Sequence, residues 1–421
     1  MTYLRTLFPP IYPLTVYWNS NTISLFFNLL LRGEIGKGHA LQELREKLIN
    51  YLKVYDFFPT NRGKTAIKLA LKAFRQISTS QKDEVLLPIY ICSSVVKAIT
   101  DVRLKPKFVN IKKDLNICVD DLKKSLSSRI LAVIVPHIYG YPAPIKEVIK
   151  IIKNYDKSIF VIDDAASAFG IKYNNNFLGT FGDVGIISFG QAKMLTASGG
   201  GGLIVNNPYL KKPLYEIYKN YKNYKNWEKT KEFLNSWWLY KLRRYSDVID
   251  YFFKRITKHH FYFSKNSLDE SKKLSNLDAA IVIQEFPKMN VVHKKRSQII
   301  HFYIKELKEL ENFGFISIPQ KDAHLYHVSR FYILTHGLMV SRDLEGRILE
   351  HNPLAKYLLY KGIKTQYGYC LPYKNFQALE IYKKNCWIES LLMLPVNHTK
   401  PIQKYRFVVS VIEFLQCKVR Q

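Results

Sequence analysis

One lysine lies among small and apolar residues in the stretch SFGQAKMLTASGGGG, which runs from Ser188 to Gly202. This residue, Lys193, follows a strand-like run and precedes the four glycines Gly199–Gly202. A lysine in a tight, partly desolvated pocket has a lowered pKa and can form a Schiff base with an aldehyde. Taken alone, however, the pattern is more typical of an exposed loop lysine before a flexible turn.

Two adjacent acids end a second strand-like run, in FVIDDAASAFG at Phe160–Gly170. Because side chains alternate along a strand, Asp163 and Asp164 should point in opposite directions, so that one of them can face a site. An acid in this place could bind a metal, cap a helix or pair with a buried cation.

A possible phosphate-binding helix start occurs in TNRGKTAIKLALKAF, Thr60–Phe74. The Gly-Lys-Thr triplet resembles the end of a P-loop, but Phe58 stands where that motif requires glycine. The start of an amphipathic helix at Gly63 would still offer free N–H groups and a positive dipole end to a phosphate. The alternative is an ordinary helix N-terminus.

Together the three features indicate pyridoxal 5'-phosphate (PLP) as a cofactor. A helix start can anchor the phosphate, an acid after a strand can keep the pyridine nitrogen protonated, and a lysine can hold the aldehyde. Each feature alone has a simpler explanation, but their combination and order are what this cofactor requires.

The alternation of elements between Asp83 and Asn207 predicts an α/β fold with a large, mostly parallel sheet. The expected strands lie at Glu84–Tyr90, Lys107–Ile111, Ile130–Tyr139, Ser158–Ala166, Val184–Gly190 and Gly201–Asn207, and the helices at Ser93–Val102, Val119–Leu126 and Ala143–Tyr155. In such sheets the ligand site lies at the carboxyl ends of the strands. The two acids and the lysine fall at such ends.

The chain is predicted to form two domains, an N-terminal arm with the large cofactor domain at 1–265 and a smaller C-terminal α+β domain at 266–421. A long helical region at Asn276–Leu307 should bend near Pro287. Residues 208–262 are rich in lysine and aromatic residues and interrupt this pattern. They suit a membrane interface or single-stranded nucleic acid, and equally a dimer contact or an aromatic-rich helical excursion.

Composition favours a basic protein of a reducing compartment. The 421 residues are 47% hydrophobic and carry a formal net charge of +30, which attracts anions, although a solvated lysine-rich surface explains the charge as well. The five cysteines are scattered without a C-x-x-C pair, so neither a zinc site nor a disulfide framework is expected. With no signal-peptide pattern at the N-terminus, we predict a cytoplasmic protein that can associate with membrane.

The motifs and their order resemble those of the DegT/DnrJ/EryC1/StrS sugar aminotransferases, which belong to fold type I of the PLP-dependent enzymes. The resemblance begins near Phe57 and covers most of the chain. The motifs that carry it are GKTAIKLAL, DEVLLP, HIYGYP, DDAASAFG, GDVGIISFGQAKMLT, LSNLDAAIVIQEF and KGIKTQYGYCLPY.

This resemblance implies a role for each matching residue. Lys193 would hold the cofactor aldehyde and carry protons, Asp164 would face the pyridine nitrogen, and Asp163 would support Asp164. The phosphate would be held by Ser188 and by the backbone around Lys64, Thr65 and Ala66. The implied reaction moves an amino group from an amino acid such as glutamate to a nucleotide-linked keto-sugar, within a homodimer.

Four positions depart from the family pattern. Ser167 stands where the family usually has glutamine, Cys92 where an aromatic residue stacks on the cofactor ring, and Ser271 and Lys273 align with an Asn-x-Arg of the neighbouring subunit. Lys193 argues against the members that carry histidine and dehydrate sugars. The alternatives are an aminotransferase with a non-sugar acceptor, or a non-catalytic regulatory, membrane-binding or nucleic-acid-binding protein, nucleic acid being the least favoured partner.

Overall fold

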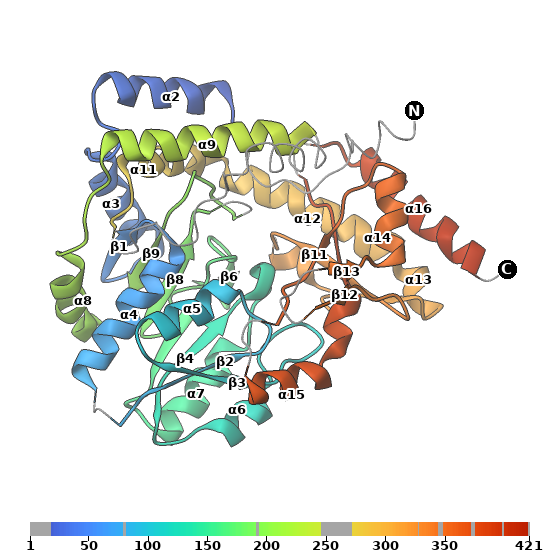
Figure 1. The fold of residues 1–421 in the computed structure, drawn as a ribbon, viewed down its shortest axis with the longest axis horizontal. Helices are drawn as coiled ribbons and strands as arrows, with labels where there is room; N and C mark the ends of the chain where they lie inside the picture. Colours follow the sequence, from blue (N-terminus) through green and yellow to red (C-terminus); the bar gives the residue numbers. More distant parts are fainter. Residues whose placement is uncertain are drawn as a thin grey trace.

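The computed structural model describes residues 18–78, 81–190, 193–245, 272–326, 328–343, 348–371, 375–397 and 400–419. A seven-stranded sheet forms the centre of the larger part (Figure 1). Its strand order is β1 (Asp56–Thr60), β9 (Gly201–Val205), β8 (Val184–Ser188), β5 (Phe160–Asp164), β4 (Ile130–Pro136), β2 (Glu84–Pro88) and β3 (Lys105–Val109). Strands β3, β2, β4, β5 and β8 are parallel, which confirms the predicted mostly parallel sheet.

Strand β9 runs antiparallel to both of its neighbours, β8 and β1. Its glycines allow these strands to approach closely. A Cβ atom on Gly202 would lie 2.1 Å from the Phe57 ring, and one on Gly201 would lie 2.6 Å from the Gly63 nitrogen. Gly201 and Gly202 are therefore part of the sheet, and they allow it to pack closely against the helix that begins at Gly63.

Helices cover both faces of this sheet because its strands are apolar throughout. The helices are α3 (Ala40–Leu52), α4 (Gly63–Ile77), α5 (Ser93–Asp101), α6 (Val119–Ser125), α7 (Ile145–Tyr155) and α11 (Asn276–Glu285). Helices α4 and α5 share one hydrophobic cluster with the sheet, and α6 and α7 share another. The sheet that carries the predicted site residues therefore has a hydrophobic core on both of its faces.

A smaller antiparallel sheet, with the order β10 (Ile316–Ser317), β11 (Phe331–Thr335), β15 (Leu391–Leu394) and β14 (Gln366–Tyr367), lies in the C-terminal part. Helices α12 (Met289–Glu306), α14 (Pro353–Tyr360) and α16 (Gln403–Val419) pack against it. A short 3₁₀ turn containing Pro287 separates α11 from α12, as the sequence predicts. The buried side chains of α11 lie with the larger sheet, and the domain division at 265/266 stays a prediction.

Two further helices, α2 (Ser20–Leu31) and α9 (Asn226–Tyr245), lie along one side of the molecule (Figure 1). Phe233 of α9 is buried and its ring stacks on Phe26 of α2, with centroids 4.5 Å apart. The predicted basic aromatic segment thus begins as a packed helical excursion, while residues 246–262 lie outside the described part of the chain. No helix in the described residues is long and apolar enough to span a bilayer.

Helix α9 is held to the protein by a buried charge cluster. Lys229 is fully buried, and its Nζ lies 2.5 Å from Asp278 Oδ2 and 3.4 Å from Glu232 Oε1.

We expect Lys229→Met to destabilise the protein by roughly 3 kcal/mol, because it leaves two buried carboxylates without their cation. Urea unfolding measures the change, and exposed Lys231→Met is the control. Equal stability of the two variants would show that this cluster does not hold α9.

Candidate active site

A cavity of about 440 Å³ opens where the carboxyl ends of β4, β5 and β8 meet the start of α4. This is the edge of a parallel sheet at which ligands bind, and the volume is that of a small-molecule site. The polar side chains among its lining residues are Arg62, Lys64, Ser94, His137, Asp164, Ser167, Ser188, Lys193, Ser198, Ser236 and Tyr369. The cavity brings the predicted acid, lysine and helix start together.

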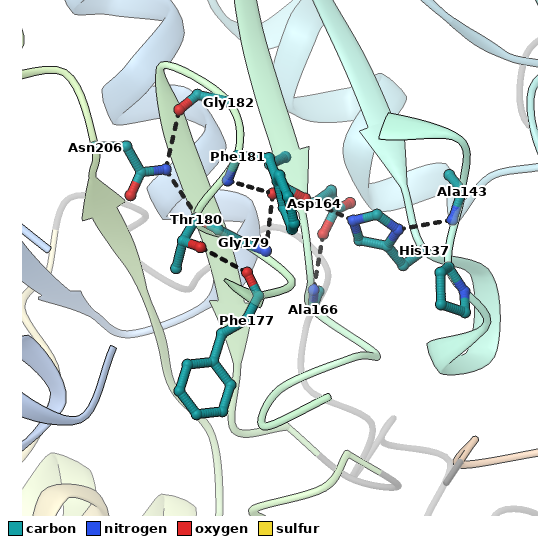
Figure 2. Close-up of polar contacts among 12 residues, drawn as sticks. His137, Ala143, Asp164, Ala166, Phe177, Gly179, Thr180, Phe181, Gly182 and Asn206 are labelled. Carbon is teal, nitrogen blue, oxygen red and sulfur yellow. Dashed lines mark hydrogen bonds and ion pairs between the residues drawn. The ribbon is translucent and has the colours of Figure 1, made fainter. Parts of the chain in front are cut away.

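Asp164 ends β5 and is only 6% exposed. Its Oδ1 accepts a hydrogen bond of 3.0 Å from the Ala166 backbone N–H (Figure 2). Burial raises the pKa of the Asp164 carboxyl, and the Ala166 N–H and the charge of Lys193 only partly oppose that effect. A cation that enters the cavity beside Asp164 would therefore be favourable, because it would stabilise the ionised carboxylate.

The neighbouring acid, Asp163, points into the protein. Its Oδ2 accepts 2.9 Å hydrogen bonds from the N–H groups of Gly179 and Phe181, and its Oδ1 lies 2.6 Å from His137 Nε2. His137 Nδ1 accepts from the Ala143 N–H at 2.9 Å (Figure 2), so Nε2 carries a proton and donates to Asp163. Asp163 thus fixes the end of β5, from which Asp164 reaches the cavity.

We expect Asp163→Asn to lower the free energy of unfolding by about 3 kcal/mol. The carboxylate accepts from three donors, whereas the amide that replaces it would direct its own N–H group at one of them. Chemical denaturation of the cofactor-free protein measures the loss, and exposed Asp120→Asn is the control. A loss no larger than that of the control would contradict this assignment.

Lys193 lies in the loop after β8, and its Nζ donates a 2.8 Å hydrogen bond to Ser167 Oγ. Burial lowers the pKa of the Lys193 ammonium, and the charge of Arg330 lowers it further, against the opposing effects of Asp164 and Cys92. A neutral amine is the nucleophilic form of lysine. The loop therefore presents a buried Lys193 side chain in a fixed orientation rather than a solvated surface lysine.

At one wall of the cavity the start of α4 lies close to the end of β8. Gly63 begins this helix, and a Cβ atom on it would lie 3.4 Å from Ser188 Cβ. Of the three predicted phosphate residues on α4, only Lys64 lines the cavity, and its Nζ pairs with Asp101 Oδ2 at 2.8 Å. Thr65 donates its hydroxyl hydrogen to Asn61 Oδ1 instead, and Ala66 is buried in the core.

The four positions that depart from the family pattern do not all lie in the cavity. Cys92 and Ser167 both line the cavity, and Cys92 Sγ lies 3.1 Å from Ser94 Oγ. Lys273 is not among the lining residues of this chain, because its Nζ lies over the Tyr218 ring, 5.2 Å from the centroid. Ser271 lies outside the described residues.

Several residues that line the cavity were not predicted from the sequence. His137 and Tyr369 belong to quoted motifs, which was a usable signal, but Ser236 comes from α9, where no pattern marks it. Tyr369 belongs to the C-terminal part, and its backbone N–H donates a 3.0 Å hydrogen bond to Tyr90 Oη. Both parts of the chain therefore contribute to one cavity.

Tyr139 links these two parts beside the cavity. It has a left-handed backbone conformation, with φ of 59°, which is unusual for a residue other than glycine. Its carbonyl oxygen accepts from the N–H of Ser329 at 2.7 Å and from the Ser329 hydroxyl at 2.9 Å, and its own hydroxyl lies 2.6 Å from Tyr90 Oη. Contacts from the C-terminal part thus stabilise a strained residue of the large part.

Comparison with known proteins identifies a family that matches most of the chain. The model of the DegT/DnrJ/EryC1/StrS aminotransferase family matches residues 19–401. A UDP-4-amino-4,6-dideoxy-N-acetyl-beta-L-altrosamine transaminase of Campylobacter jejuni is 26% identical over 91% of this chain and 92% of its own length. A GDP-perosamine synthase of Escherichia coli O157:H7 is 32% identical, over 43% of this chain and 47% of that enzyme.

A solved structure shares the fold. The putative sugar aminotransferase Spr1654 of Streptococcus pneumoniae, in its PMP form, has a TM-score of 0.74 at 15% identity and covers 97% of this chain and 100% of its own. The PLP form of the same protein has a TM-score of 0.73 at 14% identity, over 97% and 99% of the two chains. At this identity the likeness shows the fold alone.

Proposed function

Because the chain belongs to the DegT/DnrJ/EryC1/StrS aminotransferase family, we propose that it is a PLP-dependent aminotransferase that acts on a nucleotide-linked keto-sugar. The observation that carries this proposal is the placement of Lys193 and Asp164 in one cavity, between the start of α4 and the end of β5. The family supplies the reaction class, and the cavity supplies the groups that the reaction needs.

The residues present fit PLP. A phosphate would lie at the start of α4, where Gly63 leaves space beside Ser188 and the helix dipole favours an anion. A protonated pyridine nitrogen would face Asp164, because burial raises the pKa of this carboxyl despite the opposing effects of the Ala166 N–H and the charge of Lys193, and a further cation would favour its ionised form. The aldehyde would meet Lys193.

When bound, PLP supplies an electron sink for the carbon from which a proton is removed. The chain supplies the other steps. Lys193 would hold the cofactor aldehyde and its Nζ would carry the proton taken from the donor carbon, while the hydrogen bond to Ser167 Oγ orients this side chain. Asp164 would face the ring nitrogen and favour its protonated form, and His137 and Asp163 fix the strand end that bears Asp164.

The proposed acceptor is a nucleotide-linked keto-sugar, in a route to cell-surface polysaccharide or glycoconjugate. The names of the Campylobacter and Escherichia coli relatives support a nucleotide-sugar substrate, and the net charge of +30 would attract its diphosphate. Lysine at position 193, rather than histidine, favours amino transfer over dehydration. Glutamate is the proposed donor.

A two-step half-reaction assay tests this function. Purified protein is loaded with PLP, each amino acid is added in turn, and the visible band of the bound cofactor is followed. We expect glutamate to remove the band and a nucleotide keto-sugar to restore it. Absence of a band in PLP-supplemented protein would support the non-catalytic alternative, and restoration by a simple keto acid or aldehyde alone would support a non-sugar acceptor.

We further propose a homodimer, with Lys273 of one subunit directed to the site of the other. Helix α2 exposes large apolar side chains, with Phe27 54% and Leu31 86% accessible, which a second subunit would cover. Sedimentation velocity should give about twice the 49.3 kDa chain mass. A monomer at micromolar concentration would contradict the dimer without affecting the assignment of Lys193.

A cytoplasmic location with peripheral membrane contact, through the basic aromatic segment at 208–262, also remains a proposal. Its support is the sequence composition of that segment, although the described part of α9 packs against α2. Co-sedimentation with liposomes should increase with the fraction of anionic lipid. Binding that does not depend on anionic lipid would exclude this interaction.

A further inference from the structure

A hydroxyl of α9 lies against the cavity without a hydrogen-bond partner. Ser236 is only 1% exposed and lines the cavity, and its Oγ has no partner in the described part of the chain. A serine in a helix can donate its hydroxyl hydrogen to the carbonyl one turn back, but Ser236 does not do so. Because a buried hydroxyl without a partner is costly, its place in a cavity wall indicates that a ligand supplies the acceptor.

Thr230, on the same helix, shows that burial alone does not mark a binding residue. Its Oγ1 is also buried and has no hydrogen-bond partner among the described residues, but Thr230 does not line the cavity. The two hydroxyls are therefore alike in burial and differ in their access to a ligand. Thr230 is for this reason the matched control for Ser236.

Helix α9 is attached to the wall of the cavity through an acid of α11. Asp278 Oδ1 accepts hydrogen bonds from the N–H of Ser198 at 3.1 Å and from the Ser198 hydroxyl at 2.6 Å. Its Oδ2 lies 2.5 Å from Nζ of Lys229, which belongs to α9. Since Ser198 lines the cavity, one buried carboxylate holds both the wall and the helix.

The face of α9 that carries Ser236 lies next to the glycines that follow this wall. A Cβ atom on Gly199 would lie 3.3 Å from Oε1 of Glu232, the residue one helical turn before Ser236. The next residue, Gly200, has a φ of 113° and forms a β-bridge with Arg62, which immediately precedes α4. The Ser236 face of α9 therefore meets the cavity at the side that the start of α4 forms.

This side of the cavity suits a phosphate. The first N–H groups of a helix attract an anion, and Arg62 lines the cavity beside them. The oxygens of a phosphate are acceptors, and the Ser236 hydroxyl has a hydrogen to donate to one of them. Ser198 cannot take this role, because its single hydroxyl hydrogen is already donated to Asp278.

We propose that Ser236 donates a hydrogen bond to the phosphate of the cofactor, so that α9 adds a wall to the phosphate site formed by the start of α4 and Ser188. This inference rests on the proposed function. It gives an active-site role to a segment whose sequence indicates only surface contacts or packing. A hydrogen bond to a charged acceptor is stronger than one between neutral groups, and more so in a buried site.

The affinities for PLP and for pyridoxal test this hydrogen bond. Pyridoxal has the same ring and aldehyde but lacks the phosphate, so the ratio of the two dissociation constants isolates the contribution of the phosphate. Equilibrium dialysis of the full chain measures both constants without a catalytic assay. In Ser236→Ala, PLP should bind about tenfold more weakly, as expected for one lost hydrogen bond to a charged group, and pyridoxal should bind as it does to wild type.

The control variant Thr230→Val removes the other unpartnered hydroxyl of α9 and should leave both dissociation constants unchanged. Unchanged PLP binding in Ser236→Ala would overturn the proposal. Equal weakening of PLP and pyridoxal would also overturn it, since α9 would then shape the cavity without contacting the phosphate. A Ser236→Ala protein that binds PLP normally but, once loaded, binds uridine diphosphate more weakly would assign the hydroxyl to a substrate phosphate instead.

Thermal denaturation tests Ser236 by a second route. Cofactor-free Ser236→Ala should melt at the wild-type temperature or above it, because alanine removes a buried hydroxyl without a partner and favours the helix. The increase in melting temperature on adding PLP should be smaller in the variant than in wild type. A large loss of stability in the cofactor-free variant would show that the hydroxyl already has a partner inside the protein, which would overturn the proposal.

The failure of this proposal differs from a failure of the proposed function. If the protein is not a PLP-dependent enzyme, wild type will not bind PLP. If only the role of Ser236 is wrong, wild type will bind PLP more tightly than pyridoxal, and Ser236→Ala will show the same preference.

Discussion

Lys193→Ala is expected to lower the turnover number by about ten-thousandfold, because under the proposed function the variant would lack both the amine that holds the cofactor aldehyde and the group that moves the proton. The absorption band that depends on this lysine should disappear. PLP should still bind, though more weakly, because the start of α4, Ser188 and Asp164 remain. Equilibrium dialysis measures retained cofactor, and steady-state assay measures the turnover.

The control for this experiment is another lysine that lines the cavity and pairs with an acid. Lys64 also lines the cavity, but its Nζ pairs with Asp101, so Lys64→Met should retain the visible band. A Lys193→Ala protein with a normal band would show that another amine binds the aldehyde. It would thus overturn the assignment.

Asp164→Asn should reduce the turnover number by about 100- to 1000-fold, because a neutral amide cannot keep the pyridine nitrogen charged within a buried site. Lys193 remains in this variant, so the visible band should persist while the rate of its loss on addition of glutamate falls. Stopped-flow absorbance separates these two observations. Asp163→Asn should instead act mainly through stability.

Although Asp164→Asn should lower the turnover number, it should not lower the stability of the cofactor-free protein at neutral pH. Burial raises the pKa of Asp164 in the folded, cofactor-free protein above its unfolded value. The carboxyl therefore favours folding most at low pH, and this contribution is lost as the pH rises through the folded-state pKa. At neutral pH the cofactor-free Asp164→Asn protein should be as stable as wild type or more so, and its advantage should vanish in acid.

A cofactor-free Asp164→Asn protein that melts well below wild type at neutral pH would contradict this account. It would show that the ionised carboxylate already has a stabilising partner inside the protein. The melting temperature should be measured with and without PLP, because the increase on adding PLP should be smaller in the variant than in wild type.

Much of the large sheet could be predicted because its strands are apolar runs that end in chemically informative residues. The positions of Asp164 and Lys193 in one cavity follow from that pattern, since parallel strands bring their carboxyl ends to one edge. Strand β1 was not predicted, because Pro59 makes its sequence look unlike a strand. Proline is tolerated there because β1 is the edge strand of the seven-stranded sheet, beside β9.

The side-chain directions at the start of α4 could not be derived from the sequence. Successive residues of a helix point about 100° apart, so knowing where the helix begins does not tell which side chain faces the cavity. Thr65 faces Asn61 in the core, while Lys64 lines the cavity. Tyr369 and Ser236 reach the site through contacts between distant parts of the chain, which no local pattern contains.

The contact of Tyr139 with Ser329 makes the active site sensitive to the relative position of the two sheets. Were the C-terminal part to separate, the carbonyl of Tyr139 would lose both Ser329 donors, and its left-handed backbone would be free to relax. The turn that begins at His137 would relax with it. Loss of catalytic geometry and separation of the two sheets should therefore be a single cooperative event, and partial opening on heating should inactivate the enzyme before either sheet melts.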